Sequence, residues 1–240
     1  KIIYNEKEYL IQELKSNLIK IEQLIPNSKM MITGGSLQNL KILANFISQN
    51  KNSNNKSFGI RGLTGCLNLI DLEIKNANIE IINGNCEDGI NIIRSKGSIN
   101  ELSAFNSSND ALDIDFSDII ISKVNITSAG NDCVDLSFGI YKINEANIRD
   151  CGDKAISVGE QSELTIKNLN VLNSNIGIAS KDSSKTKLEN GYFKDLNICL
   201  AAYNKKQEFL GGLIKINNFD CLNTPKKIFV DDVSTINFNN

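Results

Sequence analysis

One pattern recurs every 22 residues in this chain, as Asp88-Gly89-Ile90-Asn91-Ile92, Asp110-Ala111-Leu112-Asp113-Ile114 and Asp132-Cys133-Val134-Asp135-Leu136. A fourth copy begins at Asp153 after 21 residues, and weaker copies begin at Asn175 and Asn197. A fixed period between about 20 and 50 residues is typical of repeat architectures, in which each unit stacks on its neighbours. The sequence therefore predicts a solenoid.

The pattern inside each unit indicates which solenoid it is. Apolar residues alternate with polar ones, as at Leu112 and Ile114 or Val134 and Leu136, which is the periodicity of a β-strand. A second strand-like stretch follows in each unit, and Gly, Asn, Ser and Asp cluster between the stretches, as turns require. The Leu-rich spine of leucine-rich repeats is absent, and no unit has room for a long helix. We expect a right-handed, single-stranded parallel β-helix with about 22 residues per rung.

Composition bounds the function classes. With 240 residues and 41% hydrophobic residues, one elongated domain is sufficient. The net charge of −2 and the scattered lysines do not favour nucleic-acid binding. No apolar run approaches about 18 residues, so we expect no membrane span. The sequence contains no histidine, which excludes histidine-based triads and histidine metal ligands.

The N-terminal segment differs from the repeats. In Glu6 to Lys20, the spacing of Leu10, Leu14 and Leu18 places one apolar stripe on one face of a helix. We therefore predict a short capping helix within residues 1–30, followed by the β-helix domain over residues 31–240. The Asn-, Ser- and Lys-rich stretch from Gln49 to Lys56 is predicted to be a surface loop.

The six cysteines are predicted to be mostly free. Cys133 and Cys199 share a column but lie three rungs apart, which is roughly 14 Å and beyond disulfide reach. Cys199 and Cys221 are 22 residues apart, so a regular coil would bring their Cα atoms within roughly 5 Å and would allow a bridge. Mostly free thiols favour a reducing, cytoplasmic compartment.

Aligning the rungs on their inward apolar residues defines two outward columns. The first contains Asn91, Asp113, Asp135, Ser157, Ala179 and Ala201, and the second contains Ile93, Asp115, Ser137, Gly159, Lys181 and Tyr203. Adjacent rungs are about 4.8 Å apart, so Asp113, Asp115 and Asp135 should form an acidic cluster on one sheet face.

This cluster has three interpretations. Carboxylates this close raise at least one pKa, and two of them could serve as the general acid and base of glycoside cleavage. They could instead bind Ca²⁺ through oxygen ligands, or they could simply keep the surface soluble. The neighbouring residues that we predict to bind substrate are Lys154, Ser157, Glu160, Lys181, Tyr203 and Lys205.

The leading acidic column contains Asp88, Asp110, Asp132 and Asp153. Each of these residues precedes a strand, where an aspartate caps a turn by accepting backbone N–H groups. We interpret the column as part of the fold, with one or two members that could also serve a site.

Four segments are similar to the motifs of polygalacturonases, in the same order and at the same rung spacing. They are Ser108-Asn109-Asp110-Ala111-Leu112-Asp113, Gly130-Asn131-Asp132-Cys133-Val134, Gly152-Asp153-Lys154-Ala155-Ile156-Ser157-Val158-Gly159 and Gly177-Ile178-Ala179-Ser180-Lys181. Roughly residues 30 to 230 resemble the pectin-lyase-like superfamily of right-handed β-helix proteins. The resemblance implies an extracellular protein that acts on polysaccharides.

The resemblance also implies roles for single residues. Asp110 and Asp132 match two of the three catalytic carboxylates of that pattern, and Lys181 matches its substrate-binding lysine. This chain departs from the pattern where Asn131 replaces the third carboxylate and Lys154 falls near the position of a histidine. Ala179 replaces an arginine. Ordinary polygalacturonase chemistry is therefore not expected.

Together these observations favour a carbohydrate-active protein that holds a polysaccharide along the outward face of residues 88 to 205. Asp113 and Asp135 are the predicted acid and base, and Asp115 would tune them. Lys154 and Lys181 would bind acidic sugar groups, or Lys154 could abstract a proton in a lyase or epimerase. The alternative is a non-catalytic structural or glycan-binding rod that could carry Ca²⁺.

Overall fold

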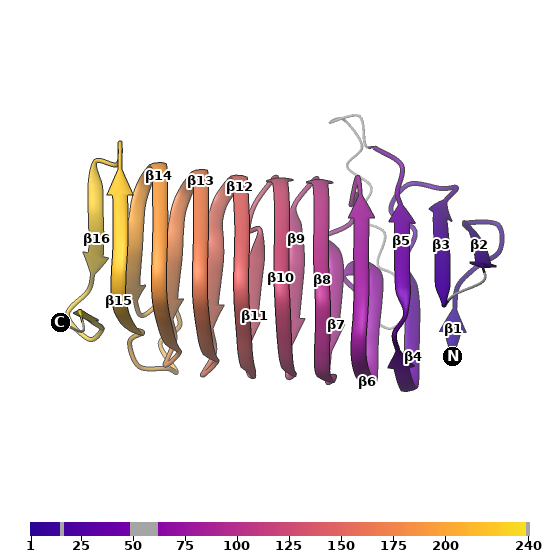
Figure 1. Cartoon of the computed structure of the whole chain (residues 1–240), viewed down its shortest axis with the longest axis horizontal. Coiled ribbons are helices and arrows are strands. Elements are labelled where there is room, and N and C mark those ends of the chain that lie inside the picture. Colours follow the sequence, from indigo (N-terminus) through magenta and orange to yellow (C-terminus); the bar gives the residue numbers. More distant parts are fainter. Residues whose placement is uncertain (15–16, 49–61, 239–240) are drawn as a thin grey trace.

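In a computed structural model, which describes residues 1–14, 17–48 and 62–238, the chain forms a parallel β-solenoid of about 9 turns (Figure 1). Each turn takes about 22 residues, and the strands of successive turns stack side by side along one axis. The predicted parallel β-solenoid is confirmed. The surface loop predicted at Gln49 to Lys56 lies outside the described residues.

The described residues contain 17 strands in one continuous hydrogen-bonded array. They are β1 (Ile2–Ile3), β2 (Tyr9–Leu14), β3 (Leu18–Gln23), β4 (Met30–Gln38), β5 (Lys41–Asn45), β6 (Gly65–Ile82), β7 (Asp88–Ile93), β8 (Lys96–Ser107), β9 (Asp110–Asp115), β10 (Asp118–Ala129), β11 (Val134–Ser137), β12 (Ile140–Gly159), β13 (Glu163–Lys181), β14 (Lys185–Tyr203), β15 (Leu213–Leu222), β16 (Lys226–Val230) and β17 (Thr235–Phe238).

Two faces of the solenoid matter for function. Sheet A is the stack of short segments formed by residues 65–70 of β6, β7, β9, β11, residues 154–158 of β12, residues 176–181 of β13, residues 198–203 of β14, and β16. Sheet B is the stack that contains residues 123–129 of β10 and the residues aligned with them in β6, β8, β12, β13, β14 and β15. A corner at residues 130–133 separates the two faces, so sites on them are distinct.

The core is built from stacked aliphatic residues. One column of sheet A contains Leu67, Ile90, Leu112, Val134, Ile156, Ile178 and Leu200, all fully buried. Burying such a side chain contributes about 1.5–3 kcal/mol, so each turn is stabilised mainly by its contact with the next. The alternation fixes the register, since a shift by one residue would turn this column outward.

The predicted capping helix is wrong. Residues 9–14 and 18–23 form the antiparallel strands β2 and β3 around a turn at Asn17, and no helix occurs in the part of the chain that the structure describes. Leu10 and Leu14 of the expected apolar stripe are 44% and 43% exposed, whereas Tyr9 and Ile21 are buried. Strand periodicity prevails because the hairpin can pair with the open edge of the solenoid, which a helix would leave unpaired.

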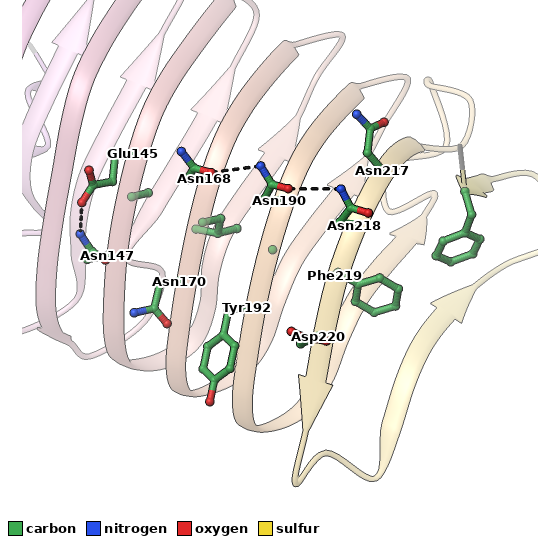
Figure 2. Close-up of a pocket in the computed structure, with 14 residues that line it drawn as sticks. Glu145, Asn147, Asn168, Asn170, Asn190, Tyr192, Asn217, Asn218, Phe219 and Asp220 are labelled. Atoms are coloured by element: carbon green, nitrogen blue, oxygen red, sulfur yellow. Dashed lines mark hydrogen bonds between the residues drawn. The ribbon is translucent and has the colours of Figure 1, made fainter. Parts of the chain in front are cut away.

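Polar ladders stabilise the outside of the coil. The Asp110 carboxylate accepts the Asp132 backbone N–H at 2.8 Å, and the Asp132 carboxylate accepts the Lys154 N–H at 3.0 Å. These two aspartates thus accept backbone N–H groups, although the donors belong to the next rung and not to the turn before their own strands. On sheet B, the side-chain amides of Asn168, Asn190 and Asn218 form a second ladder (Figure 2).

All six cysteines form disulfides, so the prediction of mostly free thiols is wrong. The pairs are Cys66–Cys86, Cys133–Cys151 and Cys199–Cys221, with Cα–Cα distances of 5.3, 5.6 and 6.3 Å. Comparing residues of one column missed the first two bridges, since their partners belong to different columns. The Cys199–Cys221 bridge, which the sequence allowed for a regular coil, forms even though the coil is not regular there, since the step from Asn190 to Asn218 is 28 residues.

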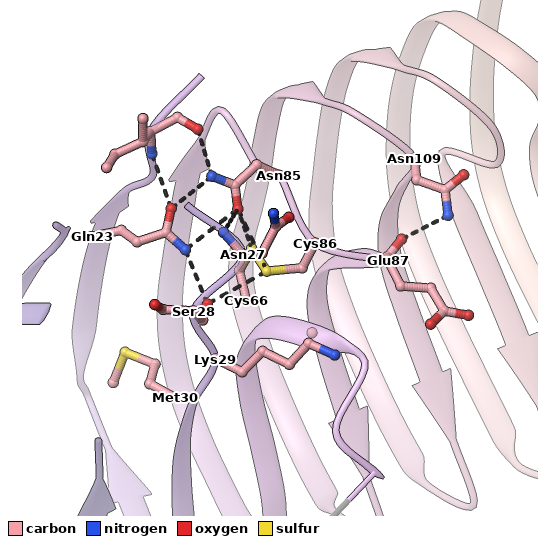
Figure 3. The surroundings of a disulfide bond; sticks show 12 residues. Gln23, Asn27, Ser28, Lys29, Met30, Cys66, Asn85, Cys86, Glu87 and Asn109 are labelled. Atoms are coloured by element: carbon pink, nitrogen blue, oxygen red, sulfur yellow. Dashed lines mark hydrogen bonds between the residues drawn. A yellow bond between two sulfur atoms is a disulfide. The ribbon is translucent and has the colours of Figure 1, made fainter. Parts of the chain in front are cut away.

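The Cys66–Cys86 bridge lies beside a polar network that holds the N-terminal cap (Figure 3). The Asn85 amide donates to the Gln23 side-chain oxygen at 2.7 Å, and Gln23 in turn donates to the Ser28 carbonyl at 2.9 Å. The buried Tyr9 hydroxyl also donates to that carbonyl. The cap is therefore fixed to the solenoid by side chains as well as by strand pairing.

Removing the central bridge should lower stability measurably. We predict that the double variant Cys133→Ala/Cys151→Ala lowers the free energy of unfolding by about 3 kcal/mol, because the bridge closes a loop in the unfolded chain across a separation of 18 residues. Urea unfolding followed by circular dichroism measures the difference. Equal stability of the variant and the oxidised protein would contradict this account.

Candidate functional site

The outward columns are arranged as predicted. Asp113 pairs with Asn91 on one side and with Asp135 on the other, and Asp135 pairs with Ser157. These four residues, which we call the acidic row, cross β7, β9, β11 and β12 on the outer surface of sheet A. Asp115 pairs with Ser137 in the second column. The structure thus brings Asp113, Asp115 and Asp135 together.

The acidic row is shielded from solvent although it is not part of the hydrophobic core. Asn91 is 2% exposed and Ser157 is fully buried, while Asp113 and Asp135 are half-buried. Asn91 Oδ1, Asp135 Oδ1 and Ser157 Oγ are buried without a hydrogen-bond partner among the described residues. Buried polar atoms are usually paired, so three unpaired atoms in one row indicate a site prepared for another molecule.

Asp113 has the most perturbed carboxyl group of the row. Burial and then the charges of Asp115 and Asp88 raise the pKa of Asp113 to about 10. Its one side-chain hydrogen bond comes from the Asn91 amide at 3.4 Å, which is too long to offset the burial. Asp113 is therefore protonated at neutral pH and can donate a proton.

The other acids around Asp113 titrate nearer neutrality. Burial, and then the charges of Asp135 and Glu160, raise the pKa of Asp115 to about 6. Burial outweighs a hydrogen bond from Thr64 and raises the pKa of Asp88 to about 7. The site thus combines protonated Asp113 with Asp115, which is largely ionised at pH 7.

Asp132 forms a buried ion pair with Lys154. The Lys154 ammonium lies 3.3 and 3.4 Å from the two Asp132 oxygens and also contacts Asp153. Burial alone would lower the pKa of Lys154, but Asp132 and Asp153 outweigh it and raise that pKa above its usual value. Lys154 is therefore a charged partner of the ladder, which disfavours its use as a proton-abstracting base.

Asp110 is held in the same ladder, since it accepts the Asn131 amide at 2.7 Å in addition to the Asp132 N–H. Burial raises the pKa of Asp110 despite these bonds, and it raises the pKa of Asp132 to about 6. Both carboxylates use their oxygens for backbone and side-chain donors. Their position favours a supporting role beside the acidic row.

Glu160 is tied to a loop rather than open to a ligand. Its carboxylate accepts the Ser137 hydroxyl at 2.6 Å and pairs with Lys206 at 2.5 Å. Burial would raise the pKa of Glu160, yet the Lys206 and Ser137 hydrogen bonds lower it. The Lys205 side chain is exposed in the same loop, and its backbone N–H donates to buried Asp182 at 2.7 Å. Lys206, which forms the ion pair with Glu160, was not among the residues predicted from the sequence.

Lys181 and Tyr203 are adjacent in the second column. Lys181 is only 4% exposed and makes no ion pair within the described residues. The charge of Lys181 acts on the nearby carboxylates of Asp153 and Glu160 and lowers their pKa values. Because neither carboxylate forms a direct ion pair with it among the described residues, the ammonium keeps hydrogen-bonding capacity for an anionic group of a ligand. Tyr203 is half-buried, and its ring meets Phe229 edge to face at 6.1 Å, so it is more enclosed than a free stacking platform.

Among the described residues, no group of three or more acidic, cysteine or histidine side chains has an arrangement that could hold a metal ion. The carboxyls of the acidic row therefore do not form a Ca²⁺ site of that kind.

The sequence analysis missed an aromatic pair beside the acidic row. Phe116 follows Asp115, Phe138 follows Ser137, and their rings stack with centroids 4.8 Å apart and planes within 3°. Phe116 is 56% exposed and Phe138 is 37% exposed, and Phe209 approaches Phe138 at 6.1 Å. The spacing of 22 residues between the two phenylalanines was the available signal.

Both phenylalanines have left-handed backbone conformations, with φ of 50°. This region is unfavourable for bulky residues and is normally taken by Gly, Asn or Asp. The same corner is also left-handed in the neighbouring turns, at Arg94 and Glu160, so the conformation belongs to the corner and the two rings occupy it at a local cost.

Comparisons of this chain with protein-family models, curated proteins and solved structures found no match in any of the three. In the described residues, no helix is both long and apolar enough to cross a membrane. The fold is a parallel β-solenoid, and its family is not shown by these comparisons.

The raised pKa of Asp113 makes a prediction about stability. The folded protein keeps a proton on Asp113 from about pH 4 to about pH 10, whereas the unfolded chain releases it above the usual value of 3.8. Stability therefore falls as pH rises through this window, by at most about 1.4 kcal/mol per pH unit from this group. Asp113→Asn removes the titration, so its stability relative to wild type should increase as pH rises from 4.

Urea unfolding at pH 4, 5.5, 7 and 8.5 measures this difference. Asp118→Asn, which removes an exposed carboxylate at the start of β10, is the control. A difference between Asp113→Asn and wild type that does not change with pH would show that Asp113 titrates in the folded state as it does in the unfolded chain.

Proposed function

We propose that this protein is a carbohydrate-active β-helix protein, related in fold to the right-handed pectin-lyase-like superfamily, that binds and cleaves a polysaccharide along the acidic row. Asp113 acts as the general acid, Asp135 as the second carboxylate, and Asp115 as the group that keeps Asp113 protonated. The observation that carries the proposal is the row itself, which places two neighbouring carboxyls among unpaired buried polar atoms on an outer sheet face.

The chemistry of glycoside cleavage fits this pair. It requires one carboxyl group that is protonated and a second that is ionised nearby. The charge of Asp115 helps to hold the proton on Asp113. Paired residues of parallel strands have Cα atoms about 4.8 Å apart, so the Asp113 and Asp135 side chains start from neighbouring positions on one face.

The surroundings of the row support an extended, acidic sugar ligand. The stacked rings of Phe116 and Phe138 provide an apolar surface for the faces of sugar rings at the adjacent corner. Buried Lys181 supplies a positive charge for a carboxylate of the sugar. The three disulfides are typical of secreted proteins, which fold in an oxidising compartment. A secreted protein would meet extracellular polysaccharides.

Turnover of acidic polysaccharides tests the catalytic assignment. On a substrate found in a panel of polygalacturonate, alginate and hyaluronate, Asp113→Asn and Asp135→Asn should each lower kcat by at least about 10²-fold, because each removes a proton-transferring or charged group. Asp118→Asn should stay within about 2-fold of wild type. Reducing-end release, with Tm as a check of folding, measures this.

The same panel distinguishes a catalytic protein from the alternative, a non-catalytic glycan-binding rod. If wild type cleaves no member of the panel but binds one of them in affinity electrophoresis, the acid–base assignment fails and a non-catalytic glycan-binding rod is supported. The engagement of Asp110 and Asp132 in the backbone ladder is the observation that favours this second candidate.

The aromatic pair makes a separate prediction. Phe116→Asn/Phe138→Asn should raise KM by at least about 10-fold while stability does not fall. Asparagine relieves left-handed strain of about 1–2 kcal/mol per residue, which offsets the lost ring stacking of about 0.5–1.5 kcal/mol. Kinetics on the cleaved substrate and urea unfolding measure the two effects. A loss of several kcal/mol with unchanged KM would show that the rings serve only the fold.

A further inference from the structure

Sheet B carries a groove that the acidic row does not explain. It has a volume of about 850 Å³ and crosses β12, β13, β14 and β15 near the C-terminal end of the solenoid (Figure 2). We call it the asparagine groove, and its main lining residues are Asn147, Asn168, Asn170, Asn190, Tyr192 and Phe219. The four turns that it spans extend about 14 Å along the axis, and a volume of this size is typical of ligand sites.

The side chains of the groove are selective for an uncharged ligand. One column of sheet B carries charged residues, Glu101, Lys123 and Glu145, and then changes to Asn168, Asn190 and Asn218. The amides replace the charges where the groove lies. No Lys or Arg is among the residues that line it, and Glu145 and Asp220 add negative charge. An anionic ligand is disfavoured there.

The amides are held in place and keep free hydrogen-bonding capacity. Asn190 donates to Asn168 at 3.1 Å, and Asn218 donates to Asn190 at 3.3 Å, which fixes the direction of these side chains. Asn190 also donates to the Lys167 carbonyl at 3.5 Å, so its remaining capacity lies on its oxygen, which has two lone pairs and accepts one ladder bond. Such a row of donors and acceptors matches the hydroxyl groups of a sugar.

Two observations go beyond what a structural asparagine ladder needs. Asn170 Oδ1 is buried and has no hydrogen-bond partner among the residues that the structure describes, which costs about 1–3 kcal/mol unless a ligand hydroxyl donates to it. Tyr192 is 37% exposed in the column next to the ladder, and Phe219 stacks on Phe238 at 5.7 Å. The groove therefore offers aromatic surface beside rigid amides.

We infer that the asparagine groove binds a neutral oligosaccharide, with sugar hydroxyls on the Asn168–Asn190–Asn218 ladder and on Asn170, and a sugar ring against Tyr192. This site is distinct from the acidic row, since it lies on another sheet and its lining disfavours anionic ligands. It gives the protein a second carbohydrate-binding face whether or not the acidic row is catalytic.

Affinity electrophoresis of the full chain in gels that contain xyloglucan, mixed-linkage β-glucan, galactomannan or soluble starch tests this inference. Wild type should be retarded by at least one of these neutral polysaccharides. Tyr192→Ala and Asn170→Ala should each weaken that retardation by at least 10-fold in apparent Kd. Tyr4→Ala and Asn78→Ala are matched controls, because Tyr4 is also 37% exposed and Asn78 lies on sheet B outside the groove. Both should bind as wild type does.

Three results would overturn the inference. They are no retardation by any of the four neutral polysaccharides, wild-type affinity in both groove variants, and equal losses in the control variants. Tm values show whether each variant is folded. Asp113→Asn should bind the neutral polysaccharide normally, so loss of turnover in that variant and loss of binding in Tyr192→Ala report on separate sites.

Discussion

The lateral register of the parallel ladder is the constraint on which this structure depends. Each residue hydrogen-bonds beside its equivalent in the next turn, about 4.8 Å away, so identical chemistry accumulates in columns. Inside the coil this produces the aliphatic column from Leu67 to Leu200, in which each side chain packs on a similar one. Outside the coil it produces rows of amides and rows of carboxylates. Stacking stabilises the amides and destabilises the carboxylates.

Asparagine and aspartate respond differently to the same stacking. An amide can donate to the amide below it and accept from the one above, as Asn190 does between Asn168 and Asn218. Two carboxylates have only acceptors, so they repel each other unless donors or cations intervene. Asp132 has both, in the Lys154 backbone N–H and the Lys154 ammonium. Asp113 has neither of these and keeps a proton instead.

The two aspartate columns therefore have different origins. In the leading column, Asp110 and Asp132 accept backbone N–H groups, and the Lys154 ammonium lies beside Asp132. Burial still raises the pKa of Asp88 to about 7 and that of Asp132 to about 6, so the compensation is partial. In the acidic row, the charges that act on Asp113 are all negative, and its pKa is raised to about 10. This contrast between Asp132 and Asp113 is the reason to propose that a ligand, rather than the coil, accounts for the acidic row.

The repeat spacing predicted the columns because a period of 22 residues and a strand period of 2 together determine register and facing. The repeat spacing gave no information about the corners, where the chain passes from one sheet to the next. It therefore missed the Cys66–Cys86 and Cys133–Cys151 bridges, which join different columns. It also assigned a helix to Leu10 and Leu14, because a spacing of four residues satisfies both a helical stripe and every second residue of a strand.

Corners are also where the most informative departure from fold requirements occurs. Most left-handed positions of this coil carry asparagine or aspartate, for example Asn76, Asn106, Asp150, Asn173 and Asp195. Phe116 and Phe138 occupy a different corner, which is left-handed in other turns as well, at Asp71, Arg94, Glu160 and Asp182. Because both rings are exposed, burial offsets little of the left-handed backbone strain, and their mutual stacking offsets only part of it. A pair of rings kept in strained, solvent-facing positions beside the acidic row is most simply explained by contact with a ligand that covers them, and a polymer of flat-faced sugar rings that passes over Asp113 would do so.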